Sequence, residues 1–353
     1  MLLYIHIPFC DSKCFYCSFN SYVNLFHLKK SYMLALEKQL KFELEKLQNN
    51  QILKSIFIGG GTPSSVDEKL YEPIFSILKN HIGTFTEITI EANPNSASTK
   101  WMQYLKKLGV NRISFGVQSF NNEKLKFLGR NHSKDQAIKA IDNASLIGFK
   151  NINCDIIYDT SFDSFKLIKE DLNIIKTLPI NHISAYSLTI EEGTKFFKNP
   201  KVKIDNLKIA NYIFSNLKQM GFIQYEISNF AKNNDAKSIH NYGYWQKEDY
   251  LGVGAGAVGY FKNKRYYPLK DIKKYIKTPT KYEKIETIND DENRFETIFL
   301  GLRSSVGVDI DIFNNRQKKN IQILIDEKKL IQKENKIYNL DFLLTDEIVL
   351  FIN

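Results

Sequence analysis

Three cysteines lie close together near the start of the chain, in the stretch HIPFCDSKCFYCSFN at residues 6–20. Cys10, Cys14 and Cys17 have the spacing C-x3-C-x2-C, and Phe19 follows two positions after the last of them. Thiolates at such short spacing bind zinc or an iron–sulfur cluster. A structural zinc ion needs four ligands, and no second CxxC or HxxxH motif lies nearby. The spacing therefore favours a cluster.

A 4Fe–4S cluster that is held by three thiolates keeps one iron open for an outside ligand. S-adenosylmethionine (SAM) chelates such an iron through its amine and carboxylate, and an electron from the cluster then cleaves the sulfonium. The three-cysteine spacing, with Tyr16 immediately before Cys17, is identified as the signature of the radical SAM superfamily. We therefore expect a 4Fe–4S cluster on the three cysteines with SAM as its partner, and we interpret Cys154 as a buried strand residue.

The composition indicates a folded protein without a nucleic-acid partner. The 353 residues exceed the usual size of one domain, and a hydrophobic fraction of 43% supplies an ample core. No apolar run approaches the roughly 20 residues that span a bilayer, and Met1 is not followed by a secretory leader. We expect a cytoplasmic location and consider peripheral association with a membrane. The net charge of +10 is densest at residues 262–284, without a zinc-finger or RNA-binding signature.

Short apolar runs alternate with helical stretches in the first part of the chain. The runs expected to form strands are residues 2–7, 52–58, 85–94, 110–120, 149–158 and 180–189. This alternation predicts a parallel sheet with right-handed crossovers. The units are too few for a closed barrel, so the expected fold class is α/β, an open (β/α)6 partial TIM-type barrel with a smaller α+β C-terminal domain. The expected segments are a core at 1–200, a core extension at 201–290 and a winged-helix-like domain at 291–353.

Polar residues follow these strands where each one ends, and parallel sheets bind their ligands at that edge. The glycine-rich GGGTP loop, residues 59–63, offers backbone groups to the amino group of SAM. Glu91, in IEANP, is placed to meet a ribose hydroxyl or an ammonium. Arg130, in FLGRNHS, is placed to pair with the methionyl carboxylate. Gln118 and Asp155 complete the set at the ends of the fourth and fifth expected strands.

A second glycine pattern points to a function that we do not expect. Gly254, Gly256 and Gly259 form G-x-G-x-x-G within GVGAGAVG. A dinucleotide-binding fingerprint needs a following helix and an acidic residue about 20 positions later. The residues that follow, YFKNKRYYP, are strand-like and basic, so dinucleotide binding is not expected.

Several stretches together resemble the oxygen-independent coproporphyrinogen III oxidase family and, within it, the HemW-type haem-chaperone branch. They are YIHIPFCDSKCFYCSFNSY, FIGGGTPS, IEANP, RISFGVQSF, LGRNH, YEISNFAK, HNYGYWQKEDYLGVGAGAVGY and ETIFLGLRSSVGVDI, and they extend over nearly the whole chain. The oxidase has a fourth cysteine two positions after the third, where this chain has Phe19. It also has a long N-terminal extension, whereas the first expected strand here begins at residue 2. Both differences favour the chaperone branch.

The resemblance implies site residues position by position. The implied SAM contacts are Tyr4, Tyr16, Gly60, Gly61, Thr62, Glu91, Gln118, Arg130 and Asp155. An HNxxYW motif that is implicated in haem binding is matched by His240, Asn241, Tyr244 and Trp245, with the histidine as a candidate iron ligand. One departure is the stretch YDTSFDS, which stands where the family has GLP, and we expect a reshaped loop there.

Three functions remain open at this point. The first is a chaperone that carries a SAM-liganded cluster, binds haem and transfers it to acceptor haem proteins, which the resemblance suggests are membrane respiratory enzymes. The second is an oxygen-independent coproporphyrinogen III oxidase, which decarboxylates two propionates by radical chemistry. The third is a radical SAM enzyme with another substrate. Phe19 and the HNxxYW match favour the first, for which a homodimer is a further expectation.

Overall fold

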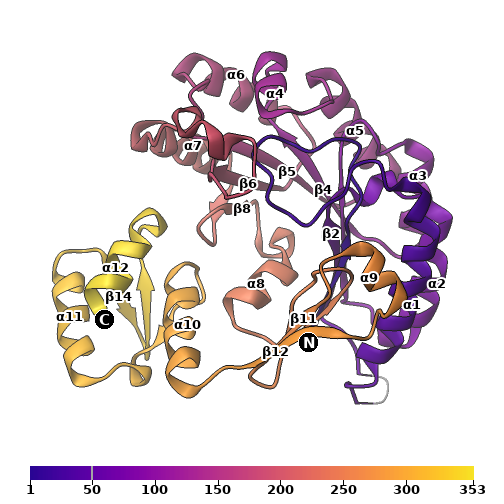
Figure 1. Ribbon diagram of the computed structural model, residues 1–353. Coiled ribbons are helices and arrows are strands. Elements are labelled where there is room, and N and C mark those ends of the chain that lie inside the picture. The colour runs from indigo at the N-terminus through magenta and orange to yellow at the C-terminus, as the bar shows by residue number, and fades with distance from the viewer. Residues whose placement is uncertain (49–50) are drawn as a thin grey trace.

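One twelve-stranded sheet organises most of the molecule (Figure 1). In the computed structural model, which describes residues 1–48 and 51–353, the strand order is β12-β11-β10-β9-β1-β2-β3-β4-β5-β6-β8-β7. The six central parallel strands are β1 (Leu2–Ile7), β2 (Ser55–Gly60), β3 (Glu87–Ala92), β4 (Arg112–Gln118), β5 (Asn151–Tyr158) and β6 (His182–Ser187). The two edge strands of the sheet do not pair with each other, so the expected open (β/α)6 barrel is confirmed.

Helices connect these strands and pack along the outer face of the curved sheet (Figure 1). They are α1 (Lys29–Leu44), α2 (Glu72–Leu78), α3 (Thr99–Leu108), α4 (Asn122–Leu128), α5 (Lys134–Ile147) and α6 (Phe165–Ile175). Polar side chains cap the N-termini of α3, α4, α5 and α6: Ser133, for example, begins α5 with a capping box that it shares with Gln136. Their apolar faces join the strands in one core, in which Ile5, Ile58 and Ile113 are buried.

The next part of the chain, which the sequence analysis expected as a core extension without naming its strands, widens the sheet on both sides. The added strands are β7 (Ile223–Gln224), β8 (Asn229–Ala231), β9 (Tyr250–Val253), β10 (Gly259–Phe261), β11 (Lys264–Pro268) and β12 (Tyr282–Thr287). The added helices are α7 (Leu207–Gln219), α8 (Ile239–Trp245) and α9 (Ile272–Lys277). Buried side chains of these elements belong to the same core cluster as the first six strands. The GVGAGAVG segment leads from β9 into β10, a strand rather than a helix.

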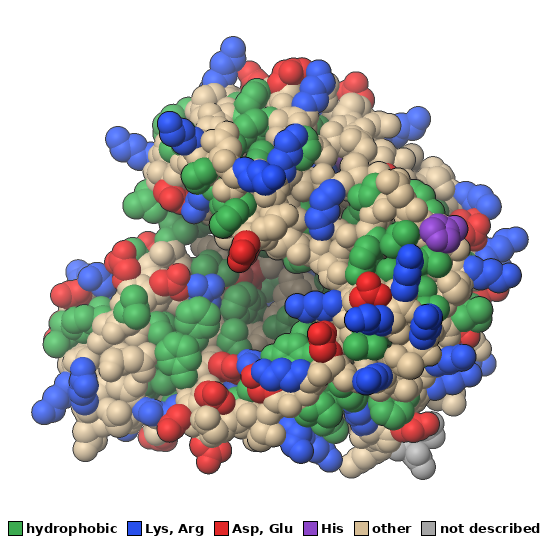
Figure 2. Space-filling model, in the orientation of Figure 1, with side chains coloured by type: hydrophobic (Ala, Val, Ile, Leu, Met, Phe, Trp, Pro, Cys, Tyr) green, Lys and Arg blue, Asp and Glu red, His purple; other side chains and the backbone are tan. Residues whose placement is uncertain are grey.

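A second, smaller hydrophobic core lies at the C-terminal end of the chain (left in Figure 1). Its helices are α10 (Asp290–Leu302), α11 (Asn315–Asp326) and α12 (Thr345–Ile352), and its antiparallel strands are β13 (Val308–Asp309), β14 (Leu330–Lys333) and β15 (Lys336–Asn339). Figure 2 shows a hollow between this lobe and the barrel, with hydrophobic side chains on the side where α10 lies. Among the described residues, every helix is too short or too polar to traverse a bilayer.

Candidate cofactor site

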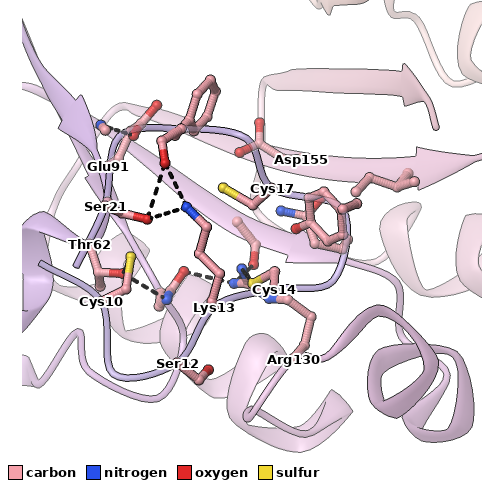
Figure 3. A pocket seen from close by; sticks show the side chains of 18 of the residues that line it. Cys10, Ser12, Lys13, Cys14, Cys17, Ser21, Thr62, Glu91, Arg130 and Asp155 are labelled. Atoms are coloured by element: carbon pink, nitrogen blue, oxygen red, sulfur yellow. Dashed lines mark hydrogen bonds between the residues drawn. The ribbon is translucent and has the colours of Figure 1, made fainter. Parts of the chain in front are cut away.

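A cavity of about 360 Å³ lies at the carboxyl ends of the parallel strands, beside the loop that carries the cysteines (Figure 3). All three clustered cysteines line it, together with eight of the nine residues that were expected to contact SAM. Those eight are Tyr16, Gly60, Gly61, Thr62, Glu91, Gln118, Arg130 and Asp155. They meet because parallel strands all end at the same edge of the sheet.

The cysteine loop between β1 and α1 is closed by a lysine. The ammonium of Lys13 donates hydrogen bonds to the carbonyl of Phe19 (2.6 Å) and the hydroxyl of Ser21 (2.7 Å) (Figure 3). Phe19 itself exposes 63% of its surface. The position therefore carries an exposed apolar ring, and it supplies no fourth thiol. Burial raises the pKa of the Cys10 and Cys17 thiols, so metal binding must displace their protons.

The GGGTP loop approaches the first strand so closely that side chains are excluded. Gly60 has a φ of +113°, and a Cβ on it would lie 2.3 Å from Nδ1 of His6. A Cβ on Gly61 would meet two carbonyl oxygens of the neighbouring segment at 2.8 Å. The hydroxyl of Thr62 lies 3.6 Å from Sγ of Cys10. The loop therefore lies against the cysteine loop and leaves its backbone accessible to a ligand.

Two carboxyl groups stand in the wall of the cavity. Glu91 on β3 accepts a hydrogen bond from the N–H of Gly60 (2.9 Å), and burial raises its pKa to about 8. Asp155 on β5 accepts one from the side chain of Asn153 (2.6 Å), and burial raises its pKa to about 6. A cation bound beside these groups would stabilise their charged forms. The cavity is therefore suited to a ligand with positive charge, which SAM carries at its sulfonium.

Two side chains in the cavity keep a buried polar atom without a hydrogen-bond partner among the described residues. Gln118 has a φ of +72°, where the register of β4 and β5 shifts, and its Oε1 has no partner. Arg130 donates to Sγ of Cys14 (3.3 Å) and to Oδ1 of Asn93 (2.7 Å), whereas its Nε has no partner. Such atoms cost free energy unless a ligand satisfies them. An amino-acid moiety supplies both a donor and an acceptor, so these residues fit the methionyl part of SAM.

Within residues 1–48 and 51–353, no group of three or more His, Cys, Asp or Glu side chains converges on a position for a single ion. A 4Fe–4S cluster requires no such convergence, because each thiolate binds a different iron. Cys154 is fully buried on β5 and does not line the cavity, as predicted.

Tyr4 is the one expected SAM residue that lies outside the cavity lining. Its hydroxyl is 2.9 Å from Nδ1 of His6, and Nε2 of His6 is 2.8 Å from the carbonyl oxygen of Asn20. Its ring centroid lies 6.2 Å from that of Phe57 and 6.4 Å from that of His240. Tyr4 therefore contacts the support of the cysteine loop on one side and the HNxxYW motif on the other.

The HNxxYW residues lie on α8 at the amino ends of the strands, where the backbone N–H of His240 donates to Glu87 at the start of β3 (3.1 Å). His240 is 1% exposed, its ring stacks on Phe57 at 5.0 Å, and burial lowers its pKa to about 3. Its Nδ1 is 2.8 Å from Oγ of Ser55, and its Nε2 is 2.9 Å from Oη of Tyr244. Both ring nitrogens are engaged. No residue of the motif lines the cofactor cavity, and Tyr4 lies between the motif and the cysteine loop.

Sequence reasoning missed several residues of the cavity, and Asn93 and Tyr186 are two of them. Asn93 bonds to Arg130 and, at 3.2 Å, to the hydroxyl of Thr62. Tyr186, near the end of β6, also lines the cavity. Both obey the rule that ligand-binding residues follow the ends of parallel strands. Asparagine is common in turns after strands and tyrosine is common within strands, so their types alone gave no signal.

Known proteins match this chain over nearly its full length. The radical SAM superfamily matches residues 4–172, which include the cysteine loop and every expected SAM residue. The chain is 33% identical to "Heme chaperone HemW" of Lactococcus lactis, over 96% of this chain and 93% of that protein. It is 34% identical to the protein of the same name from Bacillus subtilis, over 95% and 94%. The chain belongs to the HemW family of haem chaperones. The family resemblance read from the sequence is thereby confirmed, and radical SAM membership implies a 4Fe–4S cluster and SAM.

A HemW relative from Escherichia coli is 37% identical over 73% of this chain and 69% of that protein. The solved coproporphyrinogen III oxidase of Escherichia coli, described as a radical SAM enzyme, shares the fold with a TM-score of 0.83. That match covers 99% of this chain and 89% of the oxidase, at 20% identity. At this identity the likeness shows the fold alone.

Proposed function

We propose that this protein binds haem and transfers it to acceptor haem proteins, and that it holds a SAM-liganded 4Fe–4S cluster at the cavity of Figure 3. The observation that carries the proposal is the similarity to proteins named as haem chaperones, which are 33% and 34% identical to this chain over nearly its full length. A second observation agrees with it, because Phe19 is exposed at the position of the fourth cysteine of the oxidase. The alternative is an oxygen-independent coproporphyrinogen III oxidase.

Cys10, Cys14 and Cys17 are the proposed cluster ligands, and a cluster held there would supply one-electron reducing chemistry next to SAM. The other cavity residues bind and orient the cofactor. Glu91 and Asp155 place carboxyl groups beside its cationic parts. The remaining proposed contacts are the backbone of Gly60 and Gly61 and the side chains of Tyr16, Thr62, Gln118 and Arg130. Tyr4 is proposed to support the cysteine loop indirectly, because its hydroxyl contacts His6 and His6 contacts the carbonyl of Asn20.

Haem is proposed to lie in the hollow of Figure 2, between α8 and α10. Tyr244 and Trp245 are half-buried on α8. On α10, Phe295 exposes 49% of its surface and stacks on Phe299, with ring centroids 6.1 Å apart. Lys247, just after α8, donates a 2.9 Å hydrogen bond to a carbonyl of α10 and so links the two helices. An apolar macrocycle packs well on aromatic faces, and α8 and α10 both carry partly exposed aromatic side chains.

His240 enters the proposal as the residue that orients α8. Its ring holds the hydroxyl of Tyr244 on one side and that of Ser55 on the other. Ligation of haem iron by this ring requires one of these hydrogen bonds to break. Asn241 is partly exposed beside it and completes the proposed haem-contacting set with Trp245.

The partners proposed for this activity are haem and haem-poor acceptor proteins, with membrane respiratory enzymes as the class that the family resemblance suggests. A cytoplasmic location with peripheral contact to membranes accords with that role, as does a homodimer. Nucleic acid is not a proposed partner. The basic block at residues 262–284 supplies charge that would attract haem propionates.

Anaerobic reconstitution of the cluster, followed by haem titration and a coproporphyrinogen III assay on the same sample, tests the proposal. We expect stoichiometric haem binding, release of haem to a haem-depleted acceptor, and no decarboxylation under reducing, SAM-supplied conditions. Conversion to protoporphyrinogen IX with 5′-deoxyadenosine formed in step would assign the protein to the oxidase branch. Failure to bind haem would leave a radical SAM enzyme with another substrate.

A further inference from the structure

A chain of buried hydrogen bonds joins the start of α8 to the wall of the cofactor cavity. The backbone N–H of Ser238, the N-cap residue of α8, donates to Oη of Tyr225 (3.2 Å). Oη of Tyr225 is 2.8 Å from Nε2 of His182, and Nδ1 of His182 is 2.6 Å from Oδ1 of Asn153. Nδ2 of Asn153 donates to Oδ1 of Asp155 (2.6 Å), and Asp155 lines the cavity. The chain therefore ends on a residue that is proposed to contact SAM.

The intermediate residues of this chain are buried away from both solvent and the cavity. Tyr225 and His182 are each 1% exposed, Asn153 is 4% exposed, and none of the three lines the cavity. Asn153 pairs with His182 between β5 and β6, whereas the next residues along these strands, Cys154 and Ile183, point to the opposite face and join the core that the helices share. Polar groups buried this deeply cost free energy unless each is hydrogen-bonded, and here each one is.

The chemistry of the partners fixes the direction of each hydrogen bond in the chain. Oδ1 of Asn153 can only accept, so Nδ1 of His182 carries a proton. Burial lowers the pKa of His182, so the ring is neutral and its Nε2 accepts from the hydroxyl of Tyr225. Oη of Tyr225 in turn accepts from Ser238. All the donors point toward Asp155, and hydrogen bonds in such a series polarise one another.

Asn153 is held from two sides, so its amide has one orientation. Besides Asp155, its Nδ2 lies near the hydroxyls of Ser114 on β4 (2.8 Å) and Ser184 on β6 (3.0 Å). Turning the amide would place Oδ1 against the carboxyl oxygen of Asp155 and leave that oxygen without its donor. His182 opposes this turn, because its Nδ1–H requires the acceptor that Oδ1 provides. The carboxyl of Asp155 consequently faces a donor that cannot move independently.

We propose that His182 is a positioning residue of the SAM site: supported by Tyr225, it fixes Asn153 and thereby the carboxyl of Asp155 that meets the cofactor. This role rests on the proposed function, because SAM must bind in the cavity, but it does not involve haem. It gives a use to a buried histidine that neither the proposed cluster nor the proposed haem contacts employ. A purely structural role is the alternative, and the two separate experimentally because His182 would act on SAM only through Asp155.

SAM affinity of the full-length, haem-free protein, measured by anaerobic equilibrium dialysis after reconstitution of the cluster, tests this role. In Tyr225→Phe and in His182→Leu we expect the affinity to fall about three- to tenfold, as for the loss of one neutral hydrogen bond. His182→Asn should lose less than His182→Leu, because asparagine has the branching of leucine but keeps an N–H near the position of Nδ1. Circular dichroism and iron content establish that each variant is folded and loaded with cluster.

Tyr275→Phe is the matched control for Tyr225→Phe. Tyr275 on α9 is fully buried, and its hydroxyl donates to Oε1 of Gln39 (2.6 Å). The substitution therefore removes one buried hydrogen bond that is not part of the chain to Asp155. Both variants should lose stability on thermal unfolding, whereas only Tyr225→Phe should bind SAM more weakly. An equal loss of SAM affinity in the two variants would identify a general effect of destabilisation and overturn the proposed role.

A double-mutant cycle decides whether His182 acts through the carboxyl of Asp155. Asp155→Ala alone should lower SAM affinity, and adding His182→Leu to it should cost less than about twofold more, because the residue that His182 positions is gone. The same fold-loss with and without Asp155, or unaltered affinity in both His182→Leu and Tyr225→Phe, would overturn the role and leave the cavity assignment intact. Failure of the unaltered, reconstituted protein to bind SAM would overturn the proposed SAM site, and this role with it.

Discussion

The guanidinium of Arg130 lies against the thiol of Cys14, with 3.3 Å between Nη1 and Sγ. Arg130 follows α4, whereas Cys14 belongs to the loop after β1, so this contact joins the proposed SAM residues to a proposed cluster ligand. The other two guanidinium nitrogens differ in their partners: Nη2 donates to Asn93 and to the carbonyl of Gly116, and Nε is buried with no partner among the described residues. Arg130 is therefore placed to hold a negatively charged ligand group beside the cluster.

Arg130→Ala should lower SAM affinity about tenfold or more in the reconstituted protein. A charge-assisted hydrogen bond in a partly buried site contributes roughly 1.5–3 kcal/mol, which corresponds to that loss. Anaerobic equilibrium dialysis with SAM measures the change. Lys126→Ala is the control, because Lys126 lies on α4 close by in sequence and its side chain is 72% exposed. SAM affinity that is unchanged in Arg130→Ala would remove Arg130 from the site.

Replacing Cys10, Cys14 and Cys17 together by alanine should abolish the broad absorbance near 400 nm, about where such clusters absorb, together with bound iron and sulfide. The reason is that each thiolate is expected to bind a different iron. Cys154→Ala provides the control, because Cys154 is buried on β5 away from the cavity and should leave the cluster intact. Full iron and sulfide in the triple variant would contradict the assignment.

The fold and the cofactor site could be predicted from sequence where the signal is local. The cysteine spacing, GGGTP and the polar strand ends are short patterns, and the sheet places them at one cavity because its strands are parallel. Strand boundaries were less accurate. The second strand was expected from residue 52 but begins at Ser55, because the N–H of Leu53 bonds to the carbonyl of His81 outside the sheet.

Features that depend on distant contacts escaped prediction. β7 and β8 are two and three residues long, too short for a periodic pattern to show. β9 pairs with β1 although the two strands are more than 240 residues apart in the sequence, and no local pattern encodes such a pairing. His240 shows the same limit within the HNxxYW motif. The motif suggests a free ligand, whereas Ser55 and Tyr244 occupy both nitrogens of the ring.

SAM affinity should rise with pH between about 6.5 and 8 and then level off. The pKa of Glu91 is raised to about 8 by burial, so this carboxyl is protonated in the free protein below that value. If a cationic ligand binds the carboxylate form, proton release accompanies binding, and affinity grows by up to about tenfold per pH unit until the free group is ionised. In Glu91→Gln the dependence should flatten, which dialysis across the pH range can measure. The same slope in Glu91→Gln would assign the titration to another group.

Trp245→Ala should weaken haem binding, whereas Trp245→Phe should retain most of it. The proposed site packs the macrocycle on aromatic faces of α8 and α10, and an aromatic contact adds roughly 0.5–1.5 kcal/mol beyond its buried area. Phe295→Ala should weaken haem binding in the same direction, because this ring is 49% exposed on α10. Absorbance titration with haem measures each affinity. Haem affinities that are unaltered in both alanine variants would place haem elsewhere.

His240→Ala separates two roles that the ring of this histidine could have. The ring is buried against Phe57 and satisfies the hydroxyl of Ser55, so its loss should destabilise the haem-free protein by about 2–4 kcal/mol, which thermal unfolding detects. If His240 orients α8, haem affinity falls but the Soret maximum of the bound haem stays where it is in the unaltered protein. Tyr244→Phe is the matched variant, because it releases Nε2 without removing the ring. If His240 only positions α8, haem binding should be weaker in Tyr244→Phe. Tighter haem binding in Tyr244→Phe, together with a shifted Soret maximum in His240→Ala, would instead identify His240 as the iron ligand.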